Sequence, residues 1–197
     1  EKKKEFYAIS AATGATKGDS WIDIDGGIGT MLVFASKGRR ELPDQPFLVD
    51  GNMEMISKNG TFVGHHICVP LEGVALHINA FNFPVWGMLE KIAVNLLAGV
   101  PAIVKPASAT SYLTEYVVRE IVNSGILPEG ALQLVCGGVG DIFNHLTCQD
   151  VVTFTGSAHT GKMLKRHPMI VENSIRFNME ADSLNCCILG PDAEPGT

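Results

Sequence analysis

The chain has 197 residues, of which 46% are hydrophobic and 18% are charged, so it can bury one substantial core and a small appendage. Its formal net charge is −6 and its Lys and Arg clusters are short, which argues against nucleic acid or an anionic membrane as a partner. No apolar run reaches the length of a membrane span, and the first residues, EKKK, are charged, so a cytoplasmic protein is predicted.

The first part of the chain predicts two layers. Residues 1–55 are expected to form an N-terminal helical segment with stops at TGAT and DGGIG. Residues 56–79 contain two extended runs around PLEG, which predicts a β-ribbon.

Residues 80–197 alternate between helix and strand patterns. Helical spacing after Pro84 stops at Gly99, and a second helix is predicted over Thr110–Ser124. Further short helices are expected at GDIFNHL and HTGKMLKRH, and strands at PAIVKP, ALQLVCG, VVTFTGS and IRFNME. This order predicts an α/β fold with a doubly wound, Rossmann-like parallel sheet, which binds ligands at the carboxyl ends of its strands.

The five cysteines form no C-x-x-C pattern, so neither a disulfide framework nor a metal site is predicted. Cys186 and Cys187 lie in LNCCIL, which is interpreted as a buried strand and not as a nucleophile.

Asn82, in INAFNFPVWG, has two interpretations. Asparagine is a favoured helix N-cap, and Pro84 suits a first helical turn, so these residues alone favour a cap. The alternative is that the side-chain amide donates to an oxyanion in an acyl-type reaction.

The segment FTGSAHTG places glycines and hydroxyls at a strand end and helix N-terminus, where free N–H groups can face a pyrophosphate. A G-x-G-x-x-G fingerprint is absent.

Four motifs in this order, NAFNFP, IVKPAS, FTGSAHTG and FNMEADS, resemble the aldehyde dehydrogenase superfamily. DSWIDIDGGIGT, GILPEGALQL and MEADSLNCC are further similar to members that oxidise CoA-linked semialdehydes in bacterial phenylacetate breakdown. The enzymes that do so in benzoyl-CoA breakdown are the close alternative.

The resemblance implies catalytic roles for two residues. Asn82 matches the oxyanion asparagine, and Glu180 matches the general base that activates water against a thioester. The cofactor-binding residues that it implies are Ile78, Asn79, Ala80, Phe81, Lys105, Ala107, Ser108, Gly137, Phe154, Thr155, Gly156, Ser157 and Thr160. Ser108 replaces a glutamate that is common in the superfamily and would repel a 2′-phosphate, so NADP is expected, with NAD as the alternative.

The resemblance also bears on what the chain does as a whole. The family's nucleophilic cysteine lies beyond the glutamate, and this chain stops at Thr197, so a fragment without the catalytic-cysteine domain is expected. A CoA-acylating enzyme generally lacks the base, which Glu180 argues against; a module kept only for binding or assembly is a third interpretation. The expected partners are a small aldehyde, CoA-linked, and further copies of the full-length enzyme.

Overall fold

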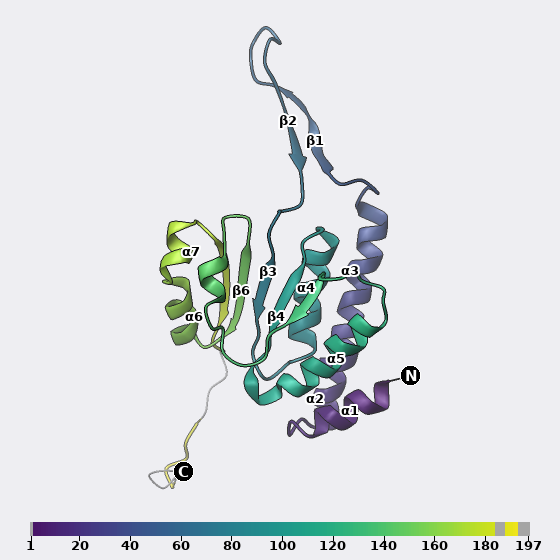
Figure 1. Cartoon of the computed structure of the whole chain (residues 1–197), viewed down its shortest axis with the longest axis vertical. Helices are drawn as coiled ribbons and strands as arrows, with labels where there is room; N and C mark the ends of the chain where they lie inside the picture. Colours follow the sequence, from purple (N-terminus) through teal and green to yellow (C-terminus); the bar gives the residue numbers. More distant parts are fainter. Residues whose placement is uncertain (1, 184–187, 193–197) are drawn as a thin grey trace.

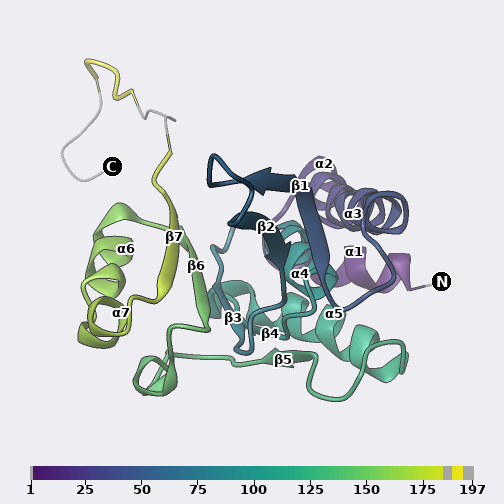
Figure 2. The same cartoon turned by 90° about the horizontal axis from the view of Figure 1, so that it is seen from above.

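Residues 2–183 and 188–192 are described by a computed structural model, in which a parallel sheet carries helices on both faces and a ribbon projects from one end (Figures 1 and 2). The ribbon pairs β1 (Leu48–Met55) with β2 (Val63–Cys68) in antiparallel fashion. The five-stranded sheet has the order β5-β4-β3-β6-β7. Its strands are β3 (Ala75–Ile78), β4 (Ala102–Lys105), β5 (Leu132–Leu134), β6 (Val151–Gly156) and β7 (Arg176–Ala181).

The helices form two layers. One contains α1 (Lys3–Ala11), α2 (Lys17–Trp21), the π-helical η1 (Ile22–Gly26), α3 (Gly27–Glu41), α4 (Trp86–Leu97) and α5 (Ser111–Asn123). The other contains α6 (Ala158–Lys165) and α7 (Pro168–Glu172), and the 3₁₀ helices are η2 (Ser108–Thr110) and η3 (Ile142–His145). Each layer packs one apolar cluster, with Met88 and Val104 in the first and Leu76 and Phe154 in the second. None of the described helices is long and apolar enough to cross a membrane.

The strand order creates a switch point between β3 and β6. The chain proceeds from β3 to β4 and then β5, and afterwards returns to add β6 and β7 on the opposite side of β3. In open parallel sheets, ligands bind at the carboxyl ends of the strands beside such a reversal. The predicted doubly wound α/β fold is therefore confirmed, and the switch point locates its ligand edge.

A buried histidine ties the central strand to its neighbours. His77 on β3 is 2% exposed. Its Nε2 lies 2.8 Å from Asn95 Oδ1 on α4, and its Nδ1 lies 2.8 Å from Thr153 Oγ1 on β6. Because the Asn95 amide nitrogen donates to the carbonyl of Val100, Oδ1 accepts, and His77 Nε2 carries the proton. Burial lowers the pKa of His77, which keeps the ring neutral.

The N-terminal layer corrects the expected stop at DGGIG. The helical backbone continues from α2 through η1 into α3 without a break. A Cβ on Gly27 would lie 2.8 Å from Trp86 Cα, so the glycine permits α3 to approach α4 closely. Gly26 and Gly27 permit close packing against Trp86, and none of the glycines in DGGIG ends the helix.

The expected boundaries of the helical segment and the ribbon were wrong. β1 lies within residues 1–55, which were assigned to helix, and the ribbon turn lies between Met55 and Val63, before PLEG. Ala75–Ile78 is the central strand of the parallel sheet, fully buried on both faces. Short apolar runs give the same signal in a ribbon and in a buried strand, which explains the error.

The expected buried strand at LNCCIL falls largely outside the described residues, because 184–187 are not described. Ile188 and Leu189, which are described, are 86% and 70% exposed and belong to no strand, so that interpretation was wrong for them.

Candidate functional site

Asn82 does not cap the helix that follows it. α4 begins at Trp86, and its N-cap, Val85, forms no side-chain capping bond. Asn82 lies four residues before the helix and is exposed, and its amide has no hydrogen bond within the described residues. The capping interpretation is wrong, and the amide is free to donate to a ligand.

Asp23 caps α4 instead, from 62 residues earlier in the chain. Its Oδ1 accepts hydrogen bonds from the N–H groups of Val85, at 3.1 Å, and Trp86, at 2.8 Å. The residue is 4% exposed, and this burial raises the pKa of Asp23 to about 6 against the opposing effect of the two hydrogen bonds. Thr114 on α5 donates to the carbonyl of Pro84 at 3.2 Å. Both contacts fix the chain directly after Asn82, and sequence analysis missed both.

The residues before Asn82 leave the sheet progressively. Ile78 is buried in β3, and the backbone N–H of Asn79 donates to the carbonyl of Lys105 at 3.0 Å. The side-chain oxygen and nitrogen of Asn79 are both buried, with no hydrogen-bond partner among the described residues. Ala80 is half-buried and Phe81 is 65% exposed. Phe81 and Asn82 are therefore exposed at this edge, whereas the Asn79 amide lies below the surface.

At the end of β4, Lys105 and Ser108 are the polar residues of the predicted ribose contact. Lys105 Nζ donates to the neighbouring carbonyl of Pro106 at 3.0 Å. Ser108 is exposed and begins η2, whose N-cap is Ala107 with no side-chain capping bond. Within residues 2–183 and 188–192 the Ser108 hydroxyl has no hydrogen-bond partner, so it is not the cap serine that its position before a helix permits.

At the end of β6, Ser157 forms the N-cap of α6. Its Oγ accepts from the N–H of Thr160 at 3.2 Å and donates to Thr160 Oγ1 at 3.0 Å. The N–H of Ala158 donates to the carboxylate of Asp182 at 2.8 Å. A Cβ on Gly161 would lie 2.4 Å from Met179 Sδ, so this glycine lets α6 pack closely on β7.

Glu180 lies at the end of β7, exposed and opposite Thr155 in the strand register. The Thr155 hydroxyl donates to Glu180 Oε2 at 3.3 Å. Phe154 is 4% exposed and its side chain belongs to the core, so only its backbone borders the site. Gly137 follows β5 with φ +104, a left-handed conformation that favours glycine.

Every predicted site residue therefore lies near or beyond the carboxyl end of a parallel strand. Asn82 follows β3, Lys105 ends β4, Gly137 follows β5, Ser157 follows β6 and Glu180 lies near the end of β7. The parallel pairing brings these ends to one edge of the sheet (Figure 1).

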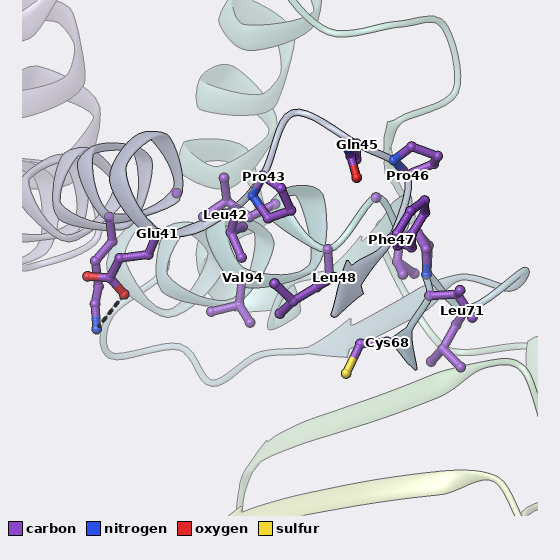
Figure 3. Close-up of a pocket in the computed structure, with 18 of the residues that line it drawn as sticks. Glu41, Leu42, Pro43, Gln45, Pro46, Phe47, Leu48, Cys68, Leu71 and Val94 are labelled. Carbon is purple, nitrogen blue, oxygen red and sulfur yellow. Dashed lines mark ion pairs between the residues drawn. The ribbon is translucent and has the colours of Figure 1, made fainter. Parts of the chain in front are cut away.

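An apolar hollow lies elsewhere on the molecule. It has a volume of about 610 Å³ and lies at the root of the ribbon, between the ends of α3 and α4 (Figure 3). Leu42, Phe47, Cys68 and Leu71 line it. Leu71 precedes β3, so the hollow belongs to the amino ends of the strands and not to the edge that carries Asn82 and Glu180.

No described cysteine lies beside Glu180. Cys68 is on the ribbon, and Cys148 accepts a hydrogen bond from Arg176 at the opposite end of β7. Cys136 follows β5, which is four strand spacings, about 19 Å, from β7. Cys186 and Cys187 lie outside the described residues.

The profile of the aldehyde dehydrogenase family matches residues 1–195, and the chain belongs to this family. It is 48% identical over 197 residues to the 3,4-dehydroadipyl-CoA semialdehyde dehydrogenase of Aromatoleum evansii. That match covers 100% of this chain and 38% of the relative, so the chain spans well under half of the relative's length.

Solved structures share the fold. Succinic semialdehyde dehydrogenase from Streptococcus pyogenes, in complex with NADP⁺, matches with a TM-score of 0.72 at 16% identity, over 92% of this chain and 37% of that one. A variant of betaine aldehyde dehydrogenase from Staphylococcus aureus, in complex with NAD⁺, matches with a TM-score of 0.71 at 25% identity, over 91% of this chain and 35% of that one.

Proposed function

We propose that this chain provides the cofactor site, the oxyanion donor and the general base of an NADP-dependent aldehyde dehydrogenase. The observation that carries the proposal is the gathering of Asn82, Lys105, Ser157 and Glu180 at one edge of the sheet, next to the switch point. The match to the aldehyde dehydrogenase family indicates which reaction these residues would serve.

The residues at this edge fit a dinucleotide. The Lys105 ammonium and the Ser108 hydroxyl meet the adenosine ribose and its 2′-phosphate, because neither is held by a charged partner in the described part of the chain. The N-terminus of α6 would hold the pyrophosphate through those backbone N–H groups that have no acceptor inside the helix. A bound nicotinamide would supply the hydride acceptor for oxidation of the substrate carbon.

Asn82 and Glu180 act on the substrate. The Asn82 amide donates a hydrogen bond to the aldehyde oxygen as negative charge develops there during attack by a thiolate. Once a hydride has left this adduct, the acyl group is held on the thiolate sulfur as a thioester. The Glu180 carboxylate takes a proton from the water that attacks the thioester, and the acid and the thiolate are released. Thr155 orients Glu180 through its hydroxyl, at 3.3 Å.

The thiolate in this proposal comes from none of the described cysteines, since Cys68, Cys136 and Cys148 lie away from Glu180. We assign it to the part of the family's longer chains that follows the glutamate. The 197 residues are therefore expected to bind dinucleotide without oxidising an aldehyde.

The substrate we propose is a CoA-linked semialdehyde formed in the breakdown of an aromatic acid. The relative at 48% identity, named for 3,4-dehydroadipyl-CoA semialdehyde, supports this class. The phenylacetate and benzoyl-CoA routes are two sources of such a substrate.

The ribbon exposes Met53, Met55 and Ile67 by 62%, 72% and 57%, which favours burial of the ribbon against further copies in the full-length enzyme.

Isothermal titration of the 197-residue chain with NADP⁺ and NAD⁺ tests the cofactor site. We expect both to bind, NADP⁺ more tightly, and Lys105→Ala to weaken both. Lys58→Ala, a change to an exposed lysine in the ribbon turn, is the matched control and should bind as the unaltered chain does. Absence of dinucleotide binding, or measurable aldehyde oxidation by this chain alone, would contradict the proposal.

A further inference from the structure

Asp182 places a carboxylate where the proposed function places the pyrophosphate of the cofactor. Its Oδ1 accepts a hydrogen bond from the N–H of Ala158 at 2.8 Å. Ala158 is the first residue of α6, so this N–H is one of those that a helix leaves without a partner inside the helix. The donor that would meet a phosphate is already paired with an anion of the chain itself.

The backbone holds Asp182 in this position. Its φ is +62, in the left-handed region that asparagine, aspartate and glycine enter more readily than other residues. Its N–H donates to the carbonyl of Gly156 at 3.0 Å, which joins the end of β7 to the turn that begins α6. Main chain and side chain therefore both anchor the residue beside the helix N-terminus.

Few donors of α6 remain free for a ligand. The N–H of Ala158 is taken by Asp182, and the N–H of Thr160 is taken by the Ser157 hydroxyl. Among the described residues, the N–H groups of Ser157 and His159 are left without a protein acceptor. A pyrophosphate at this helix end gains its third donor only when the Asp182 carboxylate turns away.

We propose that Asp182 is an internal competitor of the cofactor's pyrophosphate and lowers the affinity of the chain for dinucleotides. The inference rests on the proposed function, because it concerns the same cofactor site. Binding must break the bond to Ala158 and then place the phosphates close to a like charge. One such charge at a partly exposed site corresponds to about a tenfold loss of affinity.

Asp182→Asn and Asp182→Gly test the inference in the 197-residue chain. Both replacements remove the charge, and both residues accept a positive φ, so the turn is retained. Titration with NADP⁺ should give a Kd about 5- to 10-fold lower for each variant than for the unaltered chain. Asp44→Asn, which removes one exposed carboxylate in the loop before the ribbon, is the matched control and should leave the Kd unchanged.

The direction of the change separates competition from simple helix capping. If Asp182 only caps α6, both variants will unfold at lower temperature and bind NADP⁺ equally or more weakly, which overturns the inference. The amide resonance of Ala158 gives a second measurement, with inorganic pyrophosphate as the probe. Under competition, pyrophosphate shifts this resonance at lower concentration in Asp182→Asn than in the unaltered chain; equal concentrations contradict it.

The two proposals fail in different ways. If the unaltered chain binds dinucleotide and the variants bind no more tightly, only the role of Asp182 is overturned. If neither the unaltered chain nor the variants bind dinucleotide, the proposed function is overturned and this inference with it.

Discussion

Ser108 is the residue that most directly tests cofactor choice. Its exposed hydroxyl has no partner in the described part of the chain and follows Lys105 by three residues, at the end of β4. Ser108→Glu would place a carboxylate beside the ribose, where it repels a 2′-phosphate and accepts from the two hydroxyls of NAD. We expect the ratio of Kd for NADP⁺ to Kd for NAD⁺ to rise by about tenfold or more, the effect of one repelled charge pair.

Direct titration of both cofactors measures this ratio. Ser111→Glu is the matched control, because Ser111 lies one helical turn further on and its hydroxyl bonds the carbonyl of Ser108. An unchanged ratio in Ser108→Glu would remove Ser108 from the 2′-phosphate contact.

Substitution of Asp23 tests whether its side chain stabilises the N-terminus of α4. Asp23→Ala deprives two backbone N–H groups of their acceptor, so we expect the free energy of unfolding to fall by about 1–2 kcal/mol. Asp25→Ala, two residues away, is the matched control. Asp25 accepts hydrogen bonds from Lys3 and from the Tyr7 hydroxyl near the surface, and its loss leaves no backbone N–H without an acceptor, so it should matter less.

Amide hydrogen exchange locates the effect of Asp23→Ala. Val85 and Trp86 should exchange faster in this variant than in Asp25→Ala, because their N–H groups donate to Asp23. Unchanged exchange at both residues would show that the cap does not depend on Asp23.

The candidate site divides into residues that sequence could and could not predict. Sequence predicted the positions of Asn82, Lys105, Ser157 and Glu180 near strand ends, because each belongs to a family motif at a recognisable strand; their roles stay predictions. Asp23 was missed because its contact with α4 spans 62 residues and leaves no local pattern. The competition at Ala158 depends on a φ angle and a distance that the letters MEADS do not specify.

At the scale of elements, Gly27 and Gly29 of α3 make a matched pair. A Cβ on Gly27 would lie 2.8 Å from Trp86 Cα and 3.1 Å from its backbone nitrogen, so the two helices would have to separate. Gly27→Ala should therefore lower the free energy of unfolding by about 1–3 kcal/mol. A Cβ on Gly29 meets nothing within 4 Å, and Gly29→Ala should raise it by about 0.5–1 kcal/mol, since alanine favours helix.

Urea unfolding of both variants measures the two changes. Equal effects would mean that helix propensity, and not the approach of α3 to α4, decides the outcome at Gly27.

The sequence predicted some elements correctly and others wrongly, and the difference depends on whether the signal is local. The strands after Pro84 and most of the helices follow their own periodicity, so the doubly wound sheet was predicted correctly, whereas the short helix α7 was missed. At DGGIG the local signal indicates a turn, yet packing against Trp86 keeps the backbone helical. At residues 56–79 the expected order of the elements was wrong. An apolar run predicts a strand but does not indicate which segment pairs with it. Ala75 of β3 pairs with Ala102, 27 residues later in the chain, and not with a neighbouring ribbon strand.

At the scale of the whole molecule, two buried groups give the stability of the chain opposite dependences on pH. Burial raises the pKa of Asp23 from 3.8 to about 6, so the folded state binds more protons than the unfolded state in this range. Stability from this group therefore falls as the pH rises from about 4 to 6. Burial lowers the pKa of His77 below 6.5, so the unfolded state binds more protons there, and stability from this group rises with pH.

His77 lies at the centre of the molecule, where its ring on β3 is hydrogen-bonded to Asn95 on α4 and to Thr153 on β6. Protonation keeps the donation from Nε2 to Asn95, but it buries a charge and opposes the contact with Thr153. In a charged ring Nδ1 also becomes a donor, so the Thr153 hydroxyl can no longer donate to it. The contribution of the neutral ring is complete above pH 6.5 and is lost as the pH falls through the lowered pKa of the folded state. We therefore expect the free energy of unfolding of the unaltered chain to exceed that of His77→Gln by less as the pH falls, when both are measured by urea unfolding between pH 4.5 and 7.5.

The same comparison with Asp23→Asn should show a difference that grows as the pH falls, because the buried carboxylate becomes neutral. A His77→Gln difference that stays constant across this range would mean that the pKa of His77 is the same in the folded and unfolded states, and the central contact would then carry no pH dependence.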